Sequence, residues 1–420
     1  MFAEAIEAVP STSSAAALNA GIAAERGWLL HRPVLDPKMK IVGYEFIHAA
    51  PEAAGGREAS PQREEQRRLA ALEDLSDNWV FGDQLIFTDA AIAANARARP
   101  LLAERQMTLC CRADAAGMES ARQLHADGFT IVIDGKGAAI DNCLLPAFAG
   151  YVRFHCGELP AQMIDTLVGA YRNNAFCRLI ASVDAEEEFR HCAELGVQYF
   201  QGDWFTRPGR KSGKGKVQPI PVRVFEILDL VRNHADVRQI EQALKHDVGL
   251  SVKLLRYINS AAFGLTREIQ SFRHAVTVLG YEKLQRWLML LLVTHREQDG
   301  CPALMHTAIV RGRFAELLGK GRVGREDLDN LFMVGVFSLL EALLEAPLEE
   351  SVRELRLPAQ VSDALLARKG VYAPFLALAE ACDTSDFARI GALAQSLKVT
   401  PGEVNLARLE ALSWANLLGI

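Results

Sequence analysis

The stretch AELGVQYFQGDWFTRPGRKSGKGKVQPIP, residues 193–221, divides the chain into two regions of different composition. Its first half contains a short apolar strand, Val197–Phe200, followed by Gln201-Gly202 and a closing proline. Its second half, Gly209–Lys216, has three glycines, one serine and four basic residues but no apolar side chain, which is typical of a flexible linker. Strand-like and helical patterns alternate before this stretch, and only helical patterns follow it. The sequence therefore predicts an α/β domain joined to an all-α domain.

The length and charge of the chain exclude several classes of protein. With 420 residues, half of them apolar, the chain is long enough for two domains of roughly 200 residues each. A net charge of −6 gives no general attraction to nucleic acid or to an anionic membrane. The longest apolar run, Trp287–Val293, is too short to span a bilayer, so we expect no membrane insertion. The acidic start MFAEAIEAVP is unlike a signal peptide, and the eight cysteines form no C-x-x-C pattern. Both features predict a cytoplasmic protein with reduced thiols.

We expect four segments along the chain. Residues 1–25 predict a mobile leader, 26–208 a barrel domain, 209–221 a flexible linker and 222–420 an all-helical domain. Short apolar strands separated by amphipathic helices indicate parallel β/α units. Eight strands are expected, at Trp28–Leu35, Lys40–Ile47, Gln84–Phe87, Thr108–Cys111, Thr130–Asp134, Tyr151–Phe154, Leu179–Ala181 and Val197–Phe200. This number favours a closed or nearly closed barrel.

The working side chains of such a barrel lie at the carboxyl ends of its strands. Glu45 lies within the second expected strand. The strand ends themselves carry His48, Thr88, Asp89, Arg112, Asp134, Arg153, His155, Ser182, Asp184 and Gln201.

Four runs in this half resemble the EAL domain, the family of cyclic-di-GMP phosphodiesterases. HRPVLDPKMKIVGYEFIHA (31–49) resembles the segment that leads to the E-A-L motif, and GFTIVIDGKG (128–137) resembles the strand ending in D-D-F-G. YVRFH (151–155) resembles the K-I-D strand, and IASVDAEEEFRHCAELGVQYFQGDWFTRP (180–208) resembles the A-E-G-V-E segment. The resemblance implies an EAL-like (β/α) barrel of reduced form. It also implies an activity that relies on carboxylates and an asparagine around two divalent metal ions.

This sequence retains three of the family's site residues and departs from the family at several other positions. Glu45 stands at the E-A-L glutamate, Asp134 at the first aspartate of D-D-F-G, and Gln201 at its place before a glycine. The remaining family positions carry Thr88 near the metal-binding asparagine, Cys110 or Cys111 at a glutamate, Gly135 at the second aspartate, Arg153 at a lysine and Ser182 at the A-E-G glutamate. Two carboxylates and an amide cannot build a two-metal site, so we expect no metal, no cofactor and no hydrolysis. A vestigial pocket is expected around Arg32, Glu45, Asp134, Arg153 and Gln201.

Two cysteine patterns in this half favour structural roles. His155-Cys156 and His191-Cys192 contain the residue types that bind zinc, but they fall on separate elements without chelating spacing. Core or surface placement is therefore favoured. The neighbouring Cys110-Cys111 pair lies at a strand end, and nothing in the pattern indicates a redox role.

The most distinctive run of the second half is HDVGLSVKLLRYINSAAFG (246–264), followed by IQSFRHAVTVLGYEKLQRW (269–287). It resembles the HDOD domain, a relative of the metal-dependent HD phosphohydrolases, and the resemblance extends over 222–400. The motif residues are Leu254, Asn259, Ser260, Ala261 and Gly280. We expect them to be structural, with part of a partner surface as the alternative.

The helical half lacks the ligands of an HD hydrolase. Those enzymes need a histidine, a His-Asp pair and a distant aspartate around metal. His246-Asp247 lies at a helix boundary within the HDOD motif. The run LFMVGVFSLLEALL (331–344) resembles the helix that carries H-D, but has Phe337, Ser338, Leu339 and Leu340 in that neighbourhood. The sequence therefore predicts no metal centre in this half either.

Both resemblances imply a bacterial EAL–HDOD signal-transduction protein without its catalytic ligands. We expect a non-catalytic regulatory or scaffold protein linked to cyclic-di-GMP signalling. It would act through contacts with regulatory protein partners, and its linker would let the domains change their relative position. Two alternatives stay open: a weak residual phosphodiesterase, and a non-hydrolytic cyclic-di-GMP receptor that uses Arg32, Glu45, Arg153 and Gln201. A homo-oligomer also stays open, whereas nucleic acid is not expected, because the basic residues are scattered.

Overall fold

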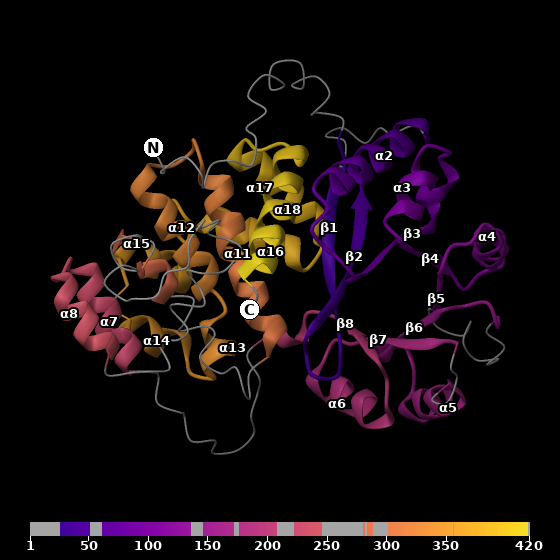
Figure 1. The fold of residues 1–420 in the computed structure, drawn as a ribbon, viewed down its shortest axis with the longest axis horizontal. Coiled ribbons are helices and arrows are strands. Elements are labelled where there is room, and N and C mark those ends of the chain that lie inside the picture. The colour runs from indigo at the N-terminus through magenta and orange to yellow at the C-terminus, as the bar shows by residue number, and fades with distance from the viewer. Residues whose placement is uncertain are drawn as a thin grey trace.

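A strand-rich half, in indigo and magenta, lies beside a helical half, in orange and yellow (Figure 1). The computed structural model describes residues 26–50, 61–135, 146–171, 176–207, 222–245, 280–281, 284–288, 301–355 and 357–418. The expected leader 1–25 and linker 209–221 lie outside the described residues, as do the HDOD motif residues Leu254, Asn259, Ser260 and Ala261.

The apolar runs of the first half form a closed barrel, in which each strand is hydrogen bonded to the next and β8 returns to β1. The strands are β1 (Trp28–Leu35), β2 (Ile41–Ala49), β3 (Leu85–Asp89), β4 (Thr108–Arg112), β5 (Ile131–Gly135), β6 (Tyr151–His155), β7 (Arg178–Ser182) and β8 (Tyr199–Gln201). One buried cluster joins five of these strands through Val34, Phe87, Val132, Tyr151 and Ile180. All eight expected strands are therefore confirmed.

Strand β1 differs from the expected pattern of parallel units. It runs antiparallel to β2 along its whole length and antiparallel to β8, with which it shares a single residue pair, Leu35 and Phe200. The reason is the short connection between β1 and β2. Asp36 closes it by accepting hydrogen bonds from the backbone N–H groups of Lys38 (2.8 Å) and Lys40 (2.9 Å). A turn this short can join only antiparallel neighbours, because parallel strands need a crossover of a dozen or more residues.

Helices follow most of the other strands and set the loops at the barrel mouth. They are α2 (Pro61–Asp77), α3 (Ala98–Glu104), α4 (Ala115–Ala126), α5 (Ala161–Tyr171) and α6 (Glu186–Leu195). The carboxylate of Glu188 accepts hydrogen bonds from the backbone N–H groups of Asp184 (2.8 Å) and Ala185 (3.3 Å), which fixes the start of α6. Gly196 ends α6 with a φ of +92°, a conformation that favours glycine.

The second half is helical throughout the part that the structure describes. Its helices are α7 (Val222–Arg232), α8 (Val237–Lys245), α11 (Pro302–Gly319), α12 (Arg325–Phe337), α13 (Leu340–Leu344), α14 (Leu348–Glu354), α15 (Ala359–Ser362), a π-helical turn η6 (Asp363–Ala367), α16 (Ala373–Asp383), α17 (Phe387–Leu397) and α18 (Pro401–Leu418). α11 and α12 cross at two glycines, and a Cβ on Gly335 would lie 2.5 Å from the Cα of Gly312. Within the described ranges, no helix has the length and apolar character needed to cross a membrane.

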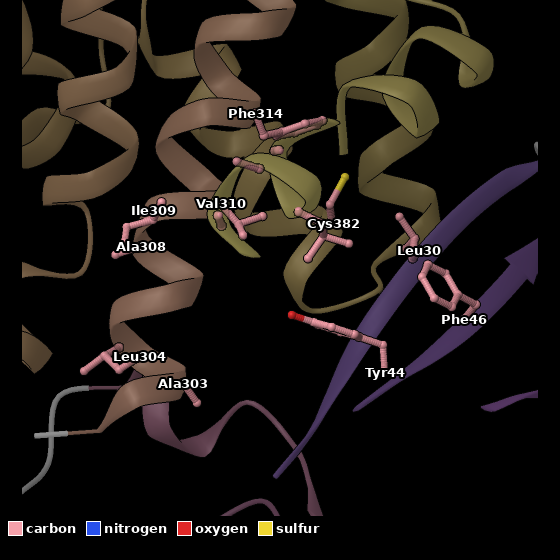
Figure 2. Close-up of a cluster of buried hydrophobic side chains, with 14 of the residues drawn as sticks. Leu30, Tyr44, Phe46, Ala303, Leu304, Ala308, Ile309, Val310, Phe314 and Cys382 are labelled. Carbon is pink, nitrogen blue, oxygen red and sulfur yellow. The ribbon is translucent and has the colours of Figure 1, made fainter. Parts of the chain in front are cut away.

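The two halves share one hydrophobic core instead of forming separate cores. Figure 2 shows Leu30 and Tyr44 from the barrel strands near Val310 and Cys382 from the helices. Hydrogen bonds also join the two halves. Asn405 on α18 binds the backbone of β1 as a neighbouring strand would. Its Oδ1 accepts from the N–H of Leu29 and its Nδ2 donates to the C=O of Gly27, both at 2.9 Å. The sequence predicted two modules free to move on a tether, whereas the described residues show a tightly packed interface.

Candidate functional site

The carboxyl ends of the barrel strands open into a cavity of about 480 Å³, which we call the barrel-mouth cavity. The barrel contributes one wall, which includes Glu45, Asp134, Arg153, His155, Ser182, Asp184 and Gln201. The helical half contributes the facing wall, which includes His306, Thr307, Val310, Asp383 and Thr384. The strand ends therefore meet at one site, as expected. The second wall was not expected, because it comes from residues more than 100 positions further along the chain.

The guanidinium group of Arg153 lies between the two carboxylates that the EAL resemblance singled out. Its Nη1 donates to Glu45 Oε1 at 2.6 Å and to Gln201 Oε1 at 3.0 Å, and its Nη2 donates to Asp134 Oδ2 at 2.7 Å. Gln201 Nε2 also donates to Glu45 Oε2 at 3.1 Å, and His155 Nε2 lies 3.0 Å from Asp134 Oδ1. The network therefore satisfies every oxygen of both carboxylates.

Strand register explains why these side chains meet. Asp134 is paired with Arg153 across β5 and β6, while Glu45 on β2 and Gln201 on β8 approach from the other side of the barrel. The side chains of Arg153 and Glu45 are only 9% and 10% exposed, so their ion pair is largely shielded from water. Hydrogen bonds between charged groups in such an environment are stronger than exposed ones.

The charges of this network fix its protonation. Burial would raise the pKa of Asp134, but the hydrogen bond from His155 and the positive charge of Arg153 outweigh it and hold that pKa well below its usual range. Burial acts to lower the pKa of Arg153, whereas the neighbouring carboxylates, Glu45 foremost, raise it well above its ordinary value. Asp134 is thus a carboxylate, and Arg153 a cation, throughout the neutral pH range.

This arrangement does not fit a divalent metal ion. The carboxylates point at a guanidinium group, which supplies the positive charge but offers no coordination position for water. Among the described residues no group of three or more His, Cys, Asp or Glu side chains is arranged to hold a metal ion. We therefore derive no metal-dependent step for this site.

Arg32, the fifth residue of the expected pocket, does not join the network. It lies exposed at the mouth of the cavity, where its Nε donates to Ser385 Oγ of the helical half at 3.3 Å. Arg207 lies at the same mouth and pairs with Asp203 at 2.8 Å. The structure thus brings together four of the five expected residues and places the fifth at the entrance.

Four of the other strand-end residues, His48, Thr88, Asp89 and Arg112, do not line the cavity. Asp89 accepts a hydrogen bond from Ala91 N at 2.8 Å, and Arg112 pairs with Asp114 on the surface. His48 lies on β2 away from the cavity, and burial lowers its pKa to about 4.

A second arginine–carboxylate cluster lies on the helical wall, and sequence reasoning missed it. Asp383 accepts hydrogen bonds from Arg311 Nε at 3.0 Å and from Arg408 Nη2 at 3.2 Å. Arg311 Nη1 also donates to Ser338 Oγ at 2.7 Å. Ser338 is one of the four residues in the neighbourhood where the resemblance places the H-D motif of HD enzymes, so a guanidinium group contacts this neighbourhood too. No sequence pattern marks Asp383, because its partners come from helices 72 and 25 positions away.

Buried histidines connect the two walls. Arg408 Nη2 lies 3.4 Å from the ring nitrogens of His31 on β1, and burial lowers the pKa of His31 well below its usual value. His306 on α11 lies 3.4 Å from Tyr44 OH and 3.0 Å from Asn416 Oδ1, and burial lowers its pKa to about 4. Both rings are neutral at pH 7, so they pack in the interface without adding charge.

The zinc ligands considered from the sequence do not converge. His155 binds Asp134, and His191 pairs with Asp165 at 2.9 Å. The two thiols between them face each other instead, with Cys156 Sγ 3.6 Å from Cys192 Sγ. The preference for core placement agrees with the burial of both cysteines.

The fold and site define a class of protein: a closed barrel whose carboxylates are held by an internal arginine, covered by a helical domain. The helical domain is identified by family, since residues 217–344 match the HDOD domain. Gly280, the HDOD motif residue that the structure describes, has a φ of +70°, which explains the preference for glycine there.

Two relatives match nearly the whole chain. The uncharacterized protein YuxH of Bacillus subtilis is 26% identical over 412 residues, which cover 94% of this chain and 99% of that protein. The cyclic di-GMP phosphodiesterase CdgJ of Vibrio cholerae is 24% identical over 404 residues, which cover 92% of each chain. Among solved structures, the phosphodiesterase PaMucR in complex with c-di-GMP is 20% identical, with a TM-score of 0.32, and covers 42% of this chain and 94% of that chain.

The chain thus has the architecture of an EAL-like barrel followed by an HDOD domain, as the sequence indicated. The HDOD match includes α11 but ends before α16 and α18. Those two helices carry Asp383, Asn405 and Arg408, which contact the barrel or line its mouth. The segment beyond the family match therefore makes much of the interface.

Proposed function

We propose that this chain is a non-catalytic regulatory protein of cyclic-di-GMP signalling. The observation that carries the proposal is the guanidinium of Arg153, 2.6 Å from Glu45 and 2.7 Å from Asp134. A phosphodiesterase of the EAL type needs metal-activated water at this place, and an arginine cannot supply it. The similarity of nearly the whole chain to a protein named as a cyclic di-GMP phosphodiesterase supports the link to this second messenger.

The test is turnover of cyclic-di-GMP by the purified full chain with Mg²⁺ or Mn²⁺. We expect no linear dinucleotide above the level formed in protein-free buffer. Glu45→Gln is the matched variant, because a contaminating phosphodiesterase would remain in its preparation. Product that forms with the wild-type chain and disappears with Glu45→Gln would overturn the proposal in favour of a weak residual phosphodiesterase.

Regulation through protein contact is the mode of action that this architecture supports. The helical half covers the barrel mouth, so a partner that binds the helices can influence the cavity without entering it. Affinity capture with the full chain, compared with the Asn405→Ala variant that weakens the interface, tests this mode. We expect a specific partner whose recovery changes with the variant, and recovery of no specific partner by either chain would count against the scaffold role.

A second candidate, a non-hydrolytic cyclic-di-GMP receptor, is favoured by the barrel-mouth cavity. Its volume of about 480 Å³ lies in the usual range for small-molecule sites, and two exposed guanidinium groups, Arg32 and Arg207, flank it. Guanidinium groups are suited to phosphodiester oxygens. Calorimetric titration of the full chain tests the receptor role. We expect binding heat that Arg32→Ala removes and that Arg190→Ala, an exposed arginine on α6 outside the cavity, leaves unchanged. No heat at high micromolar nucleotide would exclude the receptor.

A further inference from the structure

Two cysteines of the barrel domain that are 36 positions apart in the sequence lie next to each other in the structure. Cys156 begins the short turn η3 (Cys156–Glu158) directly after β6, and Cys192 lies in α6. Their Sγ atoms are 3.6 Å apart, and both residues are free thiols. A disulfide has an S–S distance of about 2.05 Å, so bond formation needs the sulfur atoms to approach by about 1.5 Å. Rotation of the two side chains can supply much of that movement.

We propose that Cys156 and Cys192 are a redox-sensitive pair that closes into a disulfide when the protein meets a peroxide. The proposal is independent of cyclic-di-GMP and of the regulatory role described above. It rests on the facing thiols and on their place between β6, which carries cavity residues, and α6, whose preceding loop also lines the cavity.

The hydrogen bond between the thiols gives them different roles. Either thiol can donate this hydrogen bond. When the Cys156 S–H donates to Cys192 Sγ, the bond lowers the pKa of Cys192 and raises the pKa of Cys156. Burial raises the pKa of Cys111, Cys177 and Cys301 to about 11. In that arrangement Cys192 is the thiol whose thiolate is favoured by a neighbour, and Cys156 is positioned to resolve its oxidised form.

The chemistry balances with one molecule of hydrogen peroxide. The Cys192 thiolate attacks one peroxide oxygen, the O–O bond breaks, and after protonation of the leaving hydroxide a sulfenic acid and water result. The Cys156 sulfur then attacks the sulfenic sulfur, the S–O bond breaks, and the hydroxyl leaves as a second water with the Cys156 proton. Two thiols have lost two electrons and two protons, and the peroxide has become two waters.

Burial sets the speed of this reaction. Cys156 is 4% exposed and Cys192 is 0% exposed, so peroxide reaches them only through local opening of the barrel wall. We therefore expect oxidation over minutes to hours at millimolar peroxide, slower than that of an exposed low-pKa thiol.

The disulfide would join the end of β6 to α6 next to the barrel-mouth cavity. His155, the residue before Cys156, binds Asp134 in the arginine network. Asp184, in the loop before α6, also lines the cavity. Oxidation would thus hold together two segments of one cavity wall.

The experiment treats the native full chain with hydrogen peroxide, blocks the remaining thiols after denaturation, and maps disulfides in a non-reducing digest by mass spectrometry. We expect one linked peptide pair containing Cys156 and Cys192, two hydrogens lighter than its parts, and a loss of two free thiols from the chain. The link should disappear on reduction. Cys177→Ser, which removes another buried thiol, should leave the link unchanged.

Two results would overturn the proposal. One is a chain in which Cys156 and Cys192 remain fully alkylatable while Cys110 or Cys111 has been oxidised. The other is a linked peptide in which Cys192 is joined to a different cysteine. Both are read from the wild-type chain, so the test does not depend on whether Cys192→Ser folds. Where that variant does fold, it should lose the linked peptide and retain the Cys156 thiol.

Discussion

Replacing Arg153 by methionine should turn the cavity network into two buried carboxylates without a cation. Methionine has a similar reach but no charge, so the substitution preserves most of the packing and removes the three hydrogen bonds of 2.6, 2.7 and 3.0 Å. Glu45 and Gln201 still bind each other, and His155 still binds Asp134. The negative charges of Glu45 and Asp134 then have no arginine beside them to balance them.

The expected loss of stability follows from the burial of the pair. Removing one partner of a buried ion pair costs about 3–5 kcal/mol, because the remaining charge stays out of water. The side chains of the two carboxylate partners of Arg153, Glu45 and Asp134, are 10% and 16% exposed, so we expect a value of about 4 kcal/mol at pH 7. Arg190→Met is the matched control. Its pair with Glu186 is exposed, and its loss should cost less than about 1 kcal/mol.

The pH dependence separates a charge effect from a packing effect. In the wild-type chain the pKa of Asp134 is held below its unfolded value, so its stabilising contribution is complete above about pH 4 and falls only as the pH drops through the folded pKa. Burial raises the pKa of Asp134, and the attraction of Arg153 lowers it. Without Arg153 the pKa of Asp134 therefore rises. The deficit of Arg153→Met should therefore be largest at pH 7 and shrink by about 1 kcal/mol or more towards pH 5.

The assay is urea unfolding of both variants and the wild-type chain at pH 5, 6 and 7, followed by circular dichroism. A packing defect alone would give a deficit that does not change with pH. The reasoning is refuted if Arg153→Met loses less than 1 kcal/mol at pH 7, or if its deficit is the same at all three pH values.

Two further substitutions test the packing that positions the site. Asn405→Ala should destabilise the full chain by about 2–4 kcal/mol in urea unfolding, because it leaves the buried N–H of Leu29 and C=O of Gly27 unpaired; a loss below about 0.5 kcal/mol would mean that α18 does not complete the edge of β1. Gly335→Ala should cost about 1–3 kcal/mol, because its Cβ would lie 2.5 Å from Gly312 and force α11 and α12 apart, whereas the control Gly391→Ala, with open space around its Cβ, should be neutral or stabilising by up to about 1 kcal/mol; equal effects at both glycines would contradict the close crossing.

The strands and most helices could be predicted from the sequence, because short apolar runs and 3.6-residue periodicity report burial on one element at a time. Strand Trp28–Leu35 was predicted to the residue. The direction of β1 was missed, although the short turn after Leu35 contained the signal. Pairing of β1 with β8 and α18 depends on segments more than 150 residues away, and no local pattern encodes it.

Part of the site could be predicted, because the resemblance to the EAL domain identifies which residues lie at the ends of the strands. Glu45, Asp134, Arg153 and Gln201 were expected together and are together, but the sequence could not show that Arg153 bridges both carboxylates. Arg32 was also expected in the pocket, and it lines the cavity as an exposed residue outside the arginine network. Asp383 was missed because a single aspartate at a helix end has many ordinary roles.

The two arginine clusters explain why the halves of this chain belong to one structural unit. On the barrel side, Arg153 balances two carboxylates, and on the helical side Asp383 lies between Arg311 and Arg408. Arg408 also reaches His31 of the barrel, so separating the halves would expose a charge that is now only 2% accessible, together with the apolar surface of β1. Such exposure is costly, because the shared core and the Asn405 contacts would be lost at the same time. A ligand or partner that acts at the barrel mouth therefore meets a composite of both domains, and an isolated barrel would lack half of that site.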